Sequence, residues 1–521
     1  MKIFTSHQIR LLDRYTIAHE PISSIDLMER AASALYNKFV VLFSVQRPVL
    51  IFAGPGNNGG DALALARMLL DRAYNVKVIL MQNAKLSADC QTNKNKLFNK
   101  YPNSLVEYLN EFHVPEISPD TIIIDGLFGS GLTGALTGVF ADTVNWVNST
   151  TNEVVSIDLP SGLQGEENND LDIPIVKADY TLTFQFPKLA FLLADNEQFV
   201  GNWEFLEIGI HPDAITSTQT NMFYLERSEI QAIIKPRPKF SHKGTFGHLL
   251  LLAGRKGMAG AAVLSAKAAL RSGAGLVSVH SAESNRIIVQ SCIPEAIFQA
   301  DNNKNIITEC VDIESYNAIA VGPGLGTKAE TTKMLKLLLE TGHQPIVLDA
   351  DALNIISTNK DLLKLIPQNS IITPHPKEFD RLFEKSENAN NRMLKVKENA
   401  QHLQIIIVLK GAHTLIALPD GTLFFNSTGN SGMATAGTGD VLTGIIGSLL
   451  AQSYSPDNAA KLGVYIHGLA ADLALKKQSK ESLIASDIID SLGDAFKNIY
   501  KYSAPQPPKG GDLERYLILN E

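Results

Sequence analysis

The chain has 521 residues, of which 45% are hydrophobic and 19% are charged, so a folded core is expected and wholesale disorder is excluded. Its formal net charge of -8 gives no basic surface of the kind that nucleic-acid-binding proteins use. The three cysteines, Cys90, Cys292 and Cys310, are too widely spaced for a metal knuckle and too few for a disulfide framework. A chain of this length is expected to form about two to four domains.

The N-terminal segment predicts a cytoplasmic protein. Residues 1–16 carry charged side chains where a signal peptide would need an apolar run. No stretch of the sequence approaches the unbroken apolar length of a membrane-spanning helix. The small number of cysteines fits a reducing compartment. We therefore expect a cytoplasmic protein that binds neither nucleic acid nor a membrane.

The first chemically suggestive stretch is a glycine-rich loop, Gly54–Asp61, between a short apolar strand and a helical pattern. It lacks the glycine spacing of a dinucleotide-binding turn and the lysine of a P-loop. It offers the polar side chains of Asn57, Asn58 and Asp61. Taken alone, the loop is better explained as a tight turn followed by a helix cap. The surrounding pattern predicts a βαβ unit and a parallel sheet, with a helix at 24–43 and strands at 48–53 and 76–81.

Two further apolar strands each end in an aspartate, Asp125 and Asp158, and each is followed by a loop of small residues. The carboxyl ends of parallel strands share one edge of a sheet, so these carboxylates are expected to converge with Asn58 and Ser161. Oxygen ligands of this kind suit a hard cation, and their chemistry leaves potassium, sodium and magnesium open. The absence of cysteine and histidine from the set excludes a typical zinc site.

The motifs PGNNGGD, DGLFGSGLTG and SIDLPSG together resemble the NAD(P)H-hydrate epimerase domain, over residues 1–222. The resemblance implies a Rossmann-like fold that interconverts the R and S epimers of hydrated NADH or NADPH. It implies a potassium ion at Asn58, Asp125 and Ser161, with Asp158 as the acid/base. The residues implied to bind the substrate are Asn57, Asn58, Gly59, Gly60, Asp61, Gly129, Ser130, Gly131, Leu132, Thr133, Gly134, Ala135 and Asp158. Strands are predicted at 184–188 and 203–208. Lys188 could face the site, although a solvated lysine is the favoured interpretation.

The regular pattern is lost over residues 211–243, and a domain boundary is predicted near 222–236. A second series of strands follows, each ending in a loop of functional appearance, which is typical of a doubly wound α/β sheet. Residues 415–418 and 422–425, joined by Pro419–Gly421, predict an antiparallel hairpin.

The stretch 426–450 changes from a glycine-rich loop to an apolar helix at Gly437–Asp440. Backbone N–H groups at a helix start attract anions, so a phosphate group is a plausible ligand there. Asp440 would be repelled by a phosphate and could instead take a proton from an attacking hydroxyl, or it could only cap the helix. His375 could contact the substrate or simply pack as a turn residue, and contact is the favoured interpretation. Lys410 either meets a phosphate or is solvated, whereas Asp349 and Asp351 are better explained as turn and helix-start acids.

The motifs GPGLG, TPHPKEF, LKGAHT and NSTGNSGMATAGTGD resemble the ribokinase-like ADP-dependent NAD(P)H-hydrate dehydratases, over residues 236–500. The resemblance implies that Asp440 deprotonates the ring hydroxyl of the S hydrate, which then accepts the terminal phosphate of ADP. Elimination of phosphate would give NAD(P)H and AMP, with magnesium bound to the diphosphate. The hydrate is implied to contact Ala259, Gly324, Gly326, His375 and Asp440. The nucleotide is implied to contact Lys410, Gly411, Ala412, His413, Thr414, Asn430, Gly437, Thr438 and Gly439.

The sequence thus predicts an α/β protein of two domains, an epimerase domain at 1–222 and a dehydratase domain at 236–500. A linker is predicted at 223–235 and a tail at 501–521, and we expect a homo-oligomer. The helical surface Leu462–Leu475 could form an interface, but a buried core is the more frequent use of such a stripe. One alternative is a ribokinase-like small-molecule kinase with a non-catalytic nucleotide-binding first domain. Another is a sensing or protein-binding first domain, against which the joint presence of Asn58, Asp125, Asp158 and Ser161 argues.

Overall fold

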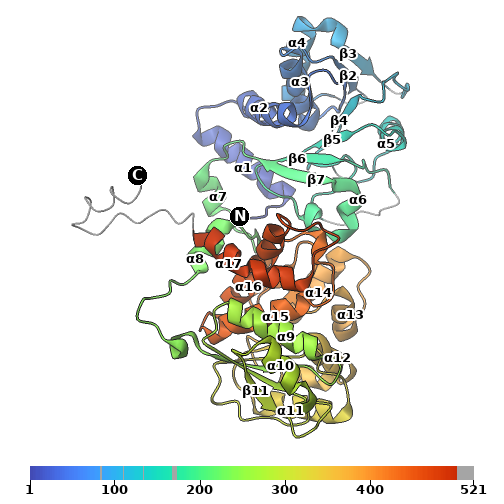
Figure 1. Ribbon diagram of the computed structural model, residues 1–521. Helices are drawn as coiled ribbons and strands as arrows, with labels where there is room; N and C mark the ends of the chain where they lie inside the picture. Colours follow the sequence, from blue (N-terminus) through green and yellow to red (C-terminus); the bar gives the residue numbers. More distant parts are fainter. Residues whose placement is uncertain (83–84, 110, 133, 167–172, 501–521) are drawn as a thin grey trace, which may run out of the picture. The chain divides into compact units, whose positions relative to one another are not determined.

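The protein is described by a computed structural model over residues 1–82, 85–109, 111–132, 134–166 and 173–500. It divides into two compact units (Figure 1). The first contains Met1–Tyr224 and Lys385–Val396, and the second contains Leu225–Glu384 and the described residues from Lys397 onward. The segment 223–235, which we predicted as a linker, holds the end of a short strand and a helix. The predicted tail 501–521 and the predicted site residue Thr133 lie outside the described residues.

The first unit alternates strands and helices for most of its length, as a parallel α/β domain does. Its strands are β1 (Val49–Ala53), β2 (Val76–Met81), β3 (Leu105–Tyr108), β4 (Ile122–Gly126), β5 (Val154–Ile157), β6 (Tyr180–Phe184), β7 (Asn202–Leu206) and β8 (Met222–Tyr224). Its helices are α1 (Ser6–His19), α2 (Ser24–Leu42), α3 (Asn57–Leu70), α4 (Ala88–Lys100), α5 (Val139–Ser149), α6 (Glu197–Val200) and α7 (Pro212–Ser217).

The first sheet has seven strands in the order β3-β2-β1-β4-β5-β6-β7, and all of the pairings are parallel. Its strands are apolar on both faces because each face is covered. Val49 and Ile51 of β1 pack with residues of α2, α3 and α4, whereas Leu50 and Phe52 pack with residues of α5. This alternation along one strand buries both faces of the sheet, which explains why the strands appear in the sequence as continuous apolar runs.

The order of the first sheet reverses between β1 and β4. The chain runs outward from β1 to β2 and β3, then returns to place β4 on the other side of β1. The loops that follow β1 and β4 therefore diverge and leave a crevice at the carboxyl edge, where ligands of such sheets bind. They approach closely at Gly54, whose N–H donates to the Gly126 carbonyl and where a Cβ would lie 1.8 Å from the Leu127 oxygen. The glycine-rich start of this loop is thus required by packing.

The second unit repeats the alternation on a larger scale. Its strands are β9 (His248–Leu252), β10 (Leu276–Ser281), β11 (Ile297–Ala300), β12 (Ala318–Val321), β13 (Ile346–Leu348), β14 (Ile371–Ile372), β15 (Ile406–Leu409), β16 (Leu415–Ala417) and β17 (Leu423–Phe425). Its helices are α8 (Arg227–Ile233), α9 (Ala259–Arg271), α10 (Arg286–Cys292), α11 (Ala329–Thr341), α12 (Ala350–Thr358), α13 (Pro376–Phe383), α15 (Thr438–Ala451), α16 (Pro456–Ala474) and α17 (Ala485–Tyr500). Helix α14 (Ala389–Leu403) crosses the division between the units.

Within the second unit, the strands of its sheet follow the order β11-β10-β9-β12-β13-β14-β15-β16-β17. The pairings are parallel from β11 to β15 and antiparallel from β15 to β17. The predicted hairpin is therefore confirmed, with Gly421 in the left-handed region at φ +85°. The order of this sheet reverses between β9 and β12, so the loops after these two strands form its crevice.

Some local predictions were wrong. The predicted strand at 184–188 lies at 180–184, because β6 ends where we expected it to begin. Helices α1 and α8 were not predicted. Helix α8 lies in the stretch where the sequence pattern is irregular, so the pattern carries no signal for it. The stripe Leu462–Leu475 belongs to α16, whose apolar residues are mostly buried within the unit.

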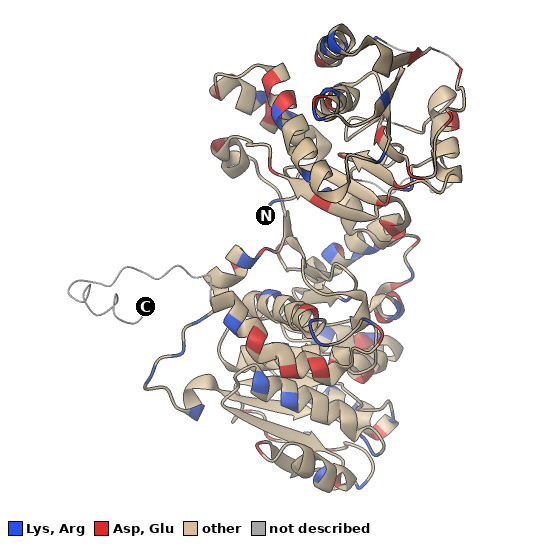
Figure 2. Cartoon of the chain, turned by 45° about the horizontal axis from the view of Figure 1, so that its top comes forward, with Lys and Arg blue, Asp and Glu red and all other residues tan. Residues whose placement is uncertain are grey.

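The surface and the helices add two general observations. Figure 2 shows that acidic and basic residues both occur along the helices of each unit. Over the part of the chain that the structure describes, none of the helices is both long enough and apolar enough to span a bilayer.

Candidate active sites

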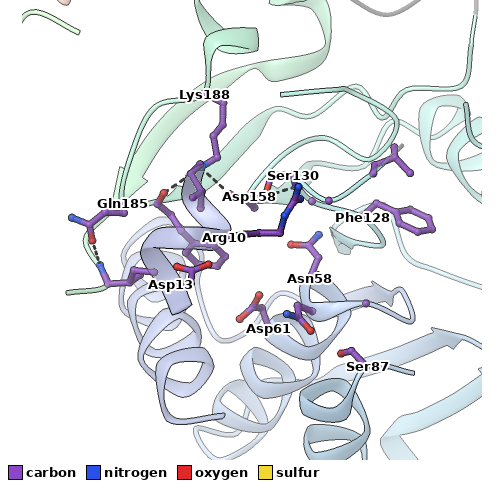
Figure 3. A pocket seen from close by; sticks show the side chains of 18 of the residues that line it. Arg10, Asp13, Asn58, Asp61, Ser87, Phe128, Ser130, Asp158, Gln185 and Lys188 are labelled. Carbon is purple, nitrogen blue, oxygen red and sulfur yellow. Dashed lines mark hydrogen bonds and ion pairs between the residues drawn. The ribbon is translucent and has the colours of Figure 1, made fainter. Parts of the chain in front are cut away.

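A cavity of about 590 Å³ opens at the crevice of the first sheet (Figure 3). Its size is typical of small-molecule sites. Predicted residues from three separate loops line it, and further residues come from α1 and from the segment after β6. The predicted residues that line it are Asn57, Asn58, Asp61, Gly129, Ser130, Gly131, Leu132 and Asp158.

Asp158 lies at the end of β5 with a backbone that few residues adopt. Its φ is +65°, in the left-handed region, which costs energy for a residue other than glycine and often marks a functional site. Its carboxylate accepts hydrogen bonds from the Ser130 N–H at 3.2 Å and the Thr183 hydroxyl at 3.0 Å. The Lys188 Nζ lies 3.1 Å from Oδ1. Burial alone would raise the pKa of Asp158, but Lys188 and the hydrogen bonds outweigh it and lower the pKa.

Lys188, predicted as a solvated lysine, is instead 2% exposed. Its ammonium group also donates to the Thr183 hydroxyl at 2.9 Å and to the carbonyls of Phe184 and Phe186 at 3.2 Å. A buried lysine is stable only with such partners. Lys188 therefore fixes a negative charge on Asp158 inside the cavity.

Two other carboxyl groups of this cavity have the opposite tendency. Burial raises the pKa of Asp61 well above its usual value, and the charges of Asp158 and Asp13 add to the rise. Burial also raises the pKa of Asp13 to about 6; Asp158 adds to the rise, whereas Lys188 opposes it. The cavity thus combines one ionised carboxylate with two carboxyl groups that hold a proton more readily.

The residues predicted to hold potassium form a cluster of oxygen donors beside the cavity. The Asp125 carboxylate, 1% exposed, accepts hydrogen bonds from the hydroxyls of Ser161 and Ser156 and from the Ser161 N–H. Burial raises the pKa of Asp125, although these hydrogen bonds oppose the rise. The Asn58 Nδ2 is buried and has no hydrogen-bond partner within the described chain. The carboxylate, hydroxyl and amide oxygens of this set are of the kind that a hard cation prefers, whereas the Asn58 Nδ2 is a hydrogen-bond donor and cannot ligate a cation.

Not every predicted residue of the first site lines the cavity. Gly59 and Gly60 lie in the first turn of α3, where a Cβ would meet the Gly54 carbonyl at 1.8 Å or the Met28 sulfur at 2.7 Å. Their glycine character is explained by packing. Gly134 and Ala135 are exposed and do not line the cavity. No cluster of three or more His, Cys, Asp or Glu residues suited to a metal occurs among the residues that the structure describes.

In the second unit, Asp440 lies in the first turn of α15. Gly437 precedes this helix in the left-handed region, at φ +92°, and no side chain caps the first N–H groups. These groups are therefore available to an anion. Burial raises the pKa of Asp440 to about 7, the charge of Asp349 adds to the rise, and Lys410 opposes it. A carboxyl group with this pKa is suited to proton transfer near neutral pH.

Lys410 follows β15 and pairs with Asp349 rather than with Asp440. Its Nζ lies 2.8 Å from Asp349 Oδ1 and 3.9 Å from Glu378 Oε2. The second oxygen of Asp349 accepts a hydrogen bond of 2.8 Å from the Thr443 hydroxyl of α15. Burial alone would lower the pKa of Lys410, but the charges of Asp349 and Glu378 outweigh it and raise the pKa. Asp349, which we explained as a turn or helix-start acid, is the N-cap residue of α12, and it also joins Lys410 to the helix that carries Asp440.

A Cβ at Gly439 would lie 3.4 Å from the Lys410 Nζ and 3.6 Å from Asp349 Oδ2, so this glycine faces the charged pair. His375 caps α13, accepting from the N–H groups of Lys377 and Glu378, and burial lowers its pKa. Asp351 accepts from the Gly326 N–H at 2.7 Å, which joins the loop after β12 to the start of α12.

The remaining predicted residues of the second site have varied surroundings. Ala259 begins α9, and Gly324 and Gly326 lie in the loop after β12 at φ +58° and +82°. The segment 410–414 turns on hydrogen bonds between Gly411 and the Thr414 hydroxyl. His413 contacts the Asn426 carbonyl.

The Asn430 amide donates to Asp472 and accepts from the Gly432 N–H, so this residue shapes its loop. Behind the turn, His467 of α16 is 8% exposed, hydrogen bonds to the Thr438 backbone and has its pKa lowered by burial to about 4.

Asp13 and His467 were not identified from the sequence, a solvated Lys188 was favoured, and the pairing of Asp349 with Lys410 was not predicted. A signal for Asp13 was present. Thr5 and Gln8 form a capping box that begins α1, and this pattern can be recognised in a sequence. The spacing from Ile9 to Leu12 and Asp13 then places these three residues on one face of the helix, and all three line the cavity.

Comparisons with known proteins agree for both halves of the chain. Residues 24–190 match the family model described as YjeF-related protein N-terminus, and residues 249–493 match that described as NAD(P)H-hydrate dehydratase. The bifunctional NAD(P)H-hydrate repair enzyme Nnr of Moorella thermoacetica is 34% identical over 96% of this chain and 97% of its own. That of Thermofilum pendens is 32% identical over 99% of both chains.

Among solved structures, the ADP/ATP-dependent NAD(P)H-hydrate dehydratase of Bacillus subtilis, co-crystallised with ATP and Mg²⁺, is 34% identical. It covers 54% of this chain and 100% of its own, with a TM-score of 0.48. The prediction of two α/β domains, the first Rossmann-like and the second ribokinase-like, is confirmed by the two sheets and the two family matches. The chain belongs to the family of bifunctional NAD(P)H-hydrate repair enzymes.

Proposed function

We propose that the first unit interconverts the R and S hydrates of NADH and NADPH, and that the second dehydrates the S hydrate with ADP as co-substrate. The relatives that match over nearly the whole chain are named as enzymes of this repair. The observation that carries the proposal is the placement of Asp440, whose pKa is about 7, at the uncapped start of α15. This placement combines an anion site with a proton acceptor, and phosphoryl transfer requires both.

In the second site, the hydroxyl of the hydrate would give its proton to Asp440 and attack the terminal phosphorus of ADP. The N–H groups at the start of α15 would hold the transferred phosphoryl group. Lys410 would neutralise charge on the nucleotide from its position between Asp349 and Glu378. This transfer leaves AMP. Loss of phosphate from the ring, together with a proton from the neighbouring ring carbon, then restores the double bond of the reduced nicotinamide. Magnesium would neutralise the charge of the diphosphate when bound.

In the first site, Asp158 would accept a proton from, or give one to, the oxygen bonded to the reacting ring carbon. Its ion pair with Lys188 supports this assignment, because an ionised carboxylate is ready to accept a proton. Asn58, Asp125 and Ser161 would hold a potassium ion, which would fix the loops after β4 and β5 beside the substrate. The placement of the Ser161 hydroxyl against the Asp125 carboxylate supports this part of the proposal, because a hard cation prefers oxygen ligands.

The proposal also includes the site residues and the boundary between the domains near residues 222–236. It further includes the use of ADP rather than ATP, a potassium ion, a cytoplasmic location and a homo-oligomer. The kinase alternative is not favoured. It leaves the first unit without a task, whereas the repair enzymes match both halves of the chain.

The test measures recovery of absorbance at 340 nm, which belongs to reduced nicotinamide. A mixture of R and S NADH hydrates is incubated with the protein, magnesium, potassium and either ADP or ATP. We expect complete recovery with ADP, faster than spontaneous epimerisation allows. Recovery that stops near half would contradict the epimerase assignment. No recovery with either nucleotide, and no difference from Asp440→Asn, would overturn the repair function.

A further inference from the structure

Asp13 is a carboxyl group of the first cavity that the proposed chemistry does not yet use. It lies on α1, on the same face as Ile9 and Leu12, and points toward the cavity in Figure 3. The family model that matches this half of the chain begins at residue 24 and does not include it. The described part of the structure gives its carboxyl group neither a hydrogen bond nor an ion pair, and leaves neither oxygen sealed from the cavity. A carboxyl group without a protein partner at a cavity wall is available to a ligand.

The charged groups that face Asp13 come from several elements. Asp61 lies on α3, Asp158 follows β5 and Lys188 follows β6, while Arg10 of α1 also lines the cavity. Lys188 is committed to Asp158 and to three further oxygens, so it does not neutralise Asp13. Burial, and next the charge of Asp158, raise the pKa of Asp13 to about 6. Asp13 and Asp158 thus reach one cavity from different elements and differ in their affinity for a proton.

The reaction of the proposed epimerase requires two proton transfers. Reduced nicotinamide is an enamine, so water adds with its oxygen on the ring carbon beside the nitrogen. That carbon is the centre at which the R and S hydrates differ. Inverting it requires the hydroxyl to leave one face as water and another water to enter the opposite face. An acid must protonate the departing oxygen, and a base must accept a proton from the entering water.

We propose that Asp13 is the second acid–base group of the epimerase site and acts opposite Asp158; this inference rests on the proposed function. In one direction, Asp13 gives its proton to the hydroxyl, the carbon–oxygen bond breaks with its electron pair on the departing water, and the ring nitrogen forms a double bond to carbon. A second water then bonds to that carbon from the other face and gives a proton to Asp158. Exchange with solvent returns both carboxyl groups to their starting states, and the reverse direction exchanges their tasks.

The arrangement also accounts for charge during the reaction. The ring intermediate carries a positive charge on nitrogen and carbon, and Asp13 becomes negative as this charge forms. A site with Asp158 alone would have to act as acid and base on both faces of the ring, although its pairing with Lys188 disfavours the protonated form. Pairs of carboxyl groups whose surroundings separate their affinities for protons are a recurrent arrangement in acid–base enzymes.

The experiment uses the full chain and compares the wild type with Asp13→Asn, Asp13→Glu and Asp142→Asn. Asp142 is an exposed carboxylate of α5, outside the cavity, and serves as the matched control. Epimerisation is followed without nucleotide, by chromatography of pure R NADH hydrate as it converts to the S form. We expect Asp13→Asn to lower kcat at least about a hundredfold with little change in KM. Asp13→Glu should restore part of the rate, and Asp142→Asn should match the wild type.

Three additional measurements separate catalysis from structure. The dehydratase rate on the S hydrate with ADP and the melting temperature of the first unit should be unchanged in Asp13→Asn, because Asp13 has no partner to lose. The wild-type epimerase rate should fall as pH rises above about 6, and this fall should be absent from the residual rate of Asp13→Asn. A wild-type rate in Asp13→Asn, or a loss confined to KM, would overturn the inference and leave the proposed function intact. A wild-type protein no faster than the spontaneous reaction would overturn both.

Discussion

The two candidate sites contain similar parts but pair them differently. Each has a lysine of low exposure beside several carboxyl groups at the carboxyl edge of a parallel sheet. In the first unit, Lys188 pairs with Asp158 and leaves Asp13 with a raised pKa of about 6. In the second, Lys410 pairs with Asp349 and leaves Asp440 with a raised pKa of about 7. Against the effect of burial, Lys188 lowers the pKa of its partner Asp158, and in both sites the carboxyl group that the lysine does not pair with can exchange a proton near neutral pH.

The largest expected effect separates the two units. Asp440→Asn removes the proposed base of the second site, so the dehydratase rate should fall by a factor of about 10²–10⁴. Conversion of R to S hydrate, measured by chromatography without nucleotide, should be unchanged. The mirror variant Asp158→Asn should retain dehydration of the S hydrate and lose enzymatic epimerisation. Loss of both activities in either variant would contradict the assignment of one task to each unit.

The second prediction tests the unequal burial of the two lysine pairs. Lys188→Met leaves the carboxylate of Asp158 buried without its charge partner, which should lower the stability of the first unit by about 3–5 kcal/mol. Lys410→Met should cost less, because the side chain of Lys410 is 23% exposed and Asp349 keeps its hydrogen bond from Thr443. Thermal unfolding measures both variants.

The double variant Asp158→Asn with Lys188→Met is the control for this pair. It removes both charges, so it should recover much of the lost stability. The prediction is contradicted if Lys188→Met and Lys410→Met lose equal amounts of stability, or if the double variant recovers none. Burial would then not explain a difference in stability between the two ion pairs.

The third prediction concerns pH. Asp440 must be ionised to accept a proton, and its pKa is about 7, so kcat/KM of the dehydratase should fall about tenfold for each pH unit below 7. Lys188 and the hydrogen bonds lower the pKa of Asp158 despite its burial, so its ionisation should not limit the epimerase rate near neutral pH. If Asp13 is the acid, the epimerase rate should instead fall above pH 6. Initial rates of the two reactions, corrected for reaction without enzyme, should therefore have opposite slopes between pH 6 and 8; slopes of the same sign would contradict the comparison.

The strands and the loops that follow them could be predicted from the sequence for a physical reason. A parallel strand buried on both faces is a continuous apolar run, and the loop at its carboxyl end carries polar and small residues. Residues 76–81 were predicted as a strand, and β2 has the same bounds. The shared edge of such a sheet then brings Asn58 and Asp158 together, although a hundred residues of chain separate their loops.

The pairing of charges could not be predicted in the same way. Lys188 looks like any lysine after a strand, and its burial depends on the position of Asp158 and on three oxygens supplied by the turn around it. Lys410 pairs with a carboxylate 61 residues earlier in the chain, while Asp440 lies closer in sequence. Nothing in the local pattern distinguishes these partners, because the choice is made by side-chain packing between elements. The fold therefore sets the pKa of each carboxyl group in the two sites. The direction of proton transfer depends on these pKa values.

The smallest expected effect concerns the glycine that faces the charged pair in each site. A Cβ at Gly439 would be in ordinary contact, 3.4 Å from Lys410 Nζ, whereas a Cβ at Gly129 would lie 3.0 Å from Asp158 Oδ2 and 3.1 Å from Asn58 Oδ1. Gly439→Ala should leave the melting temperature nearly unchanged, since alanine favours the helix. Its methyl group would occupy space beside Lys410 that the nucleotide needs, so KM for ADP should rise about tenfold, equivalent to about 1.4 kcal/mol.

Gly129→Ala is the matched variant in the first unit, and its effect should differ in kind. The added methyl group displaces the Asp158 carboxylate from Lys188 or moves the Asn58 amide, so it should lower both the epimerase kcat and the melting temperature of the first unit. Steady-state kinetics and thermal unfolding of the two variants measure the difference. A fall in melting temperature for Gly439→Ala, or a change confined to KM for Gly129→Ala, would contradict the view that the second site keeps open space beside its lysine. It would mean instead that both sites are closed around their ion pairs until substrate binds, so that the free space at Gly439 does not belong to the nucleotide.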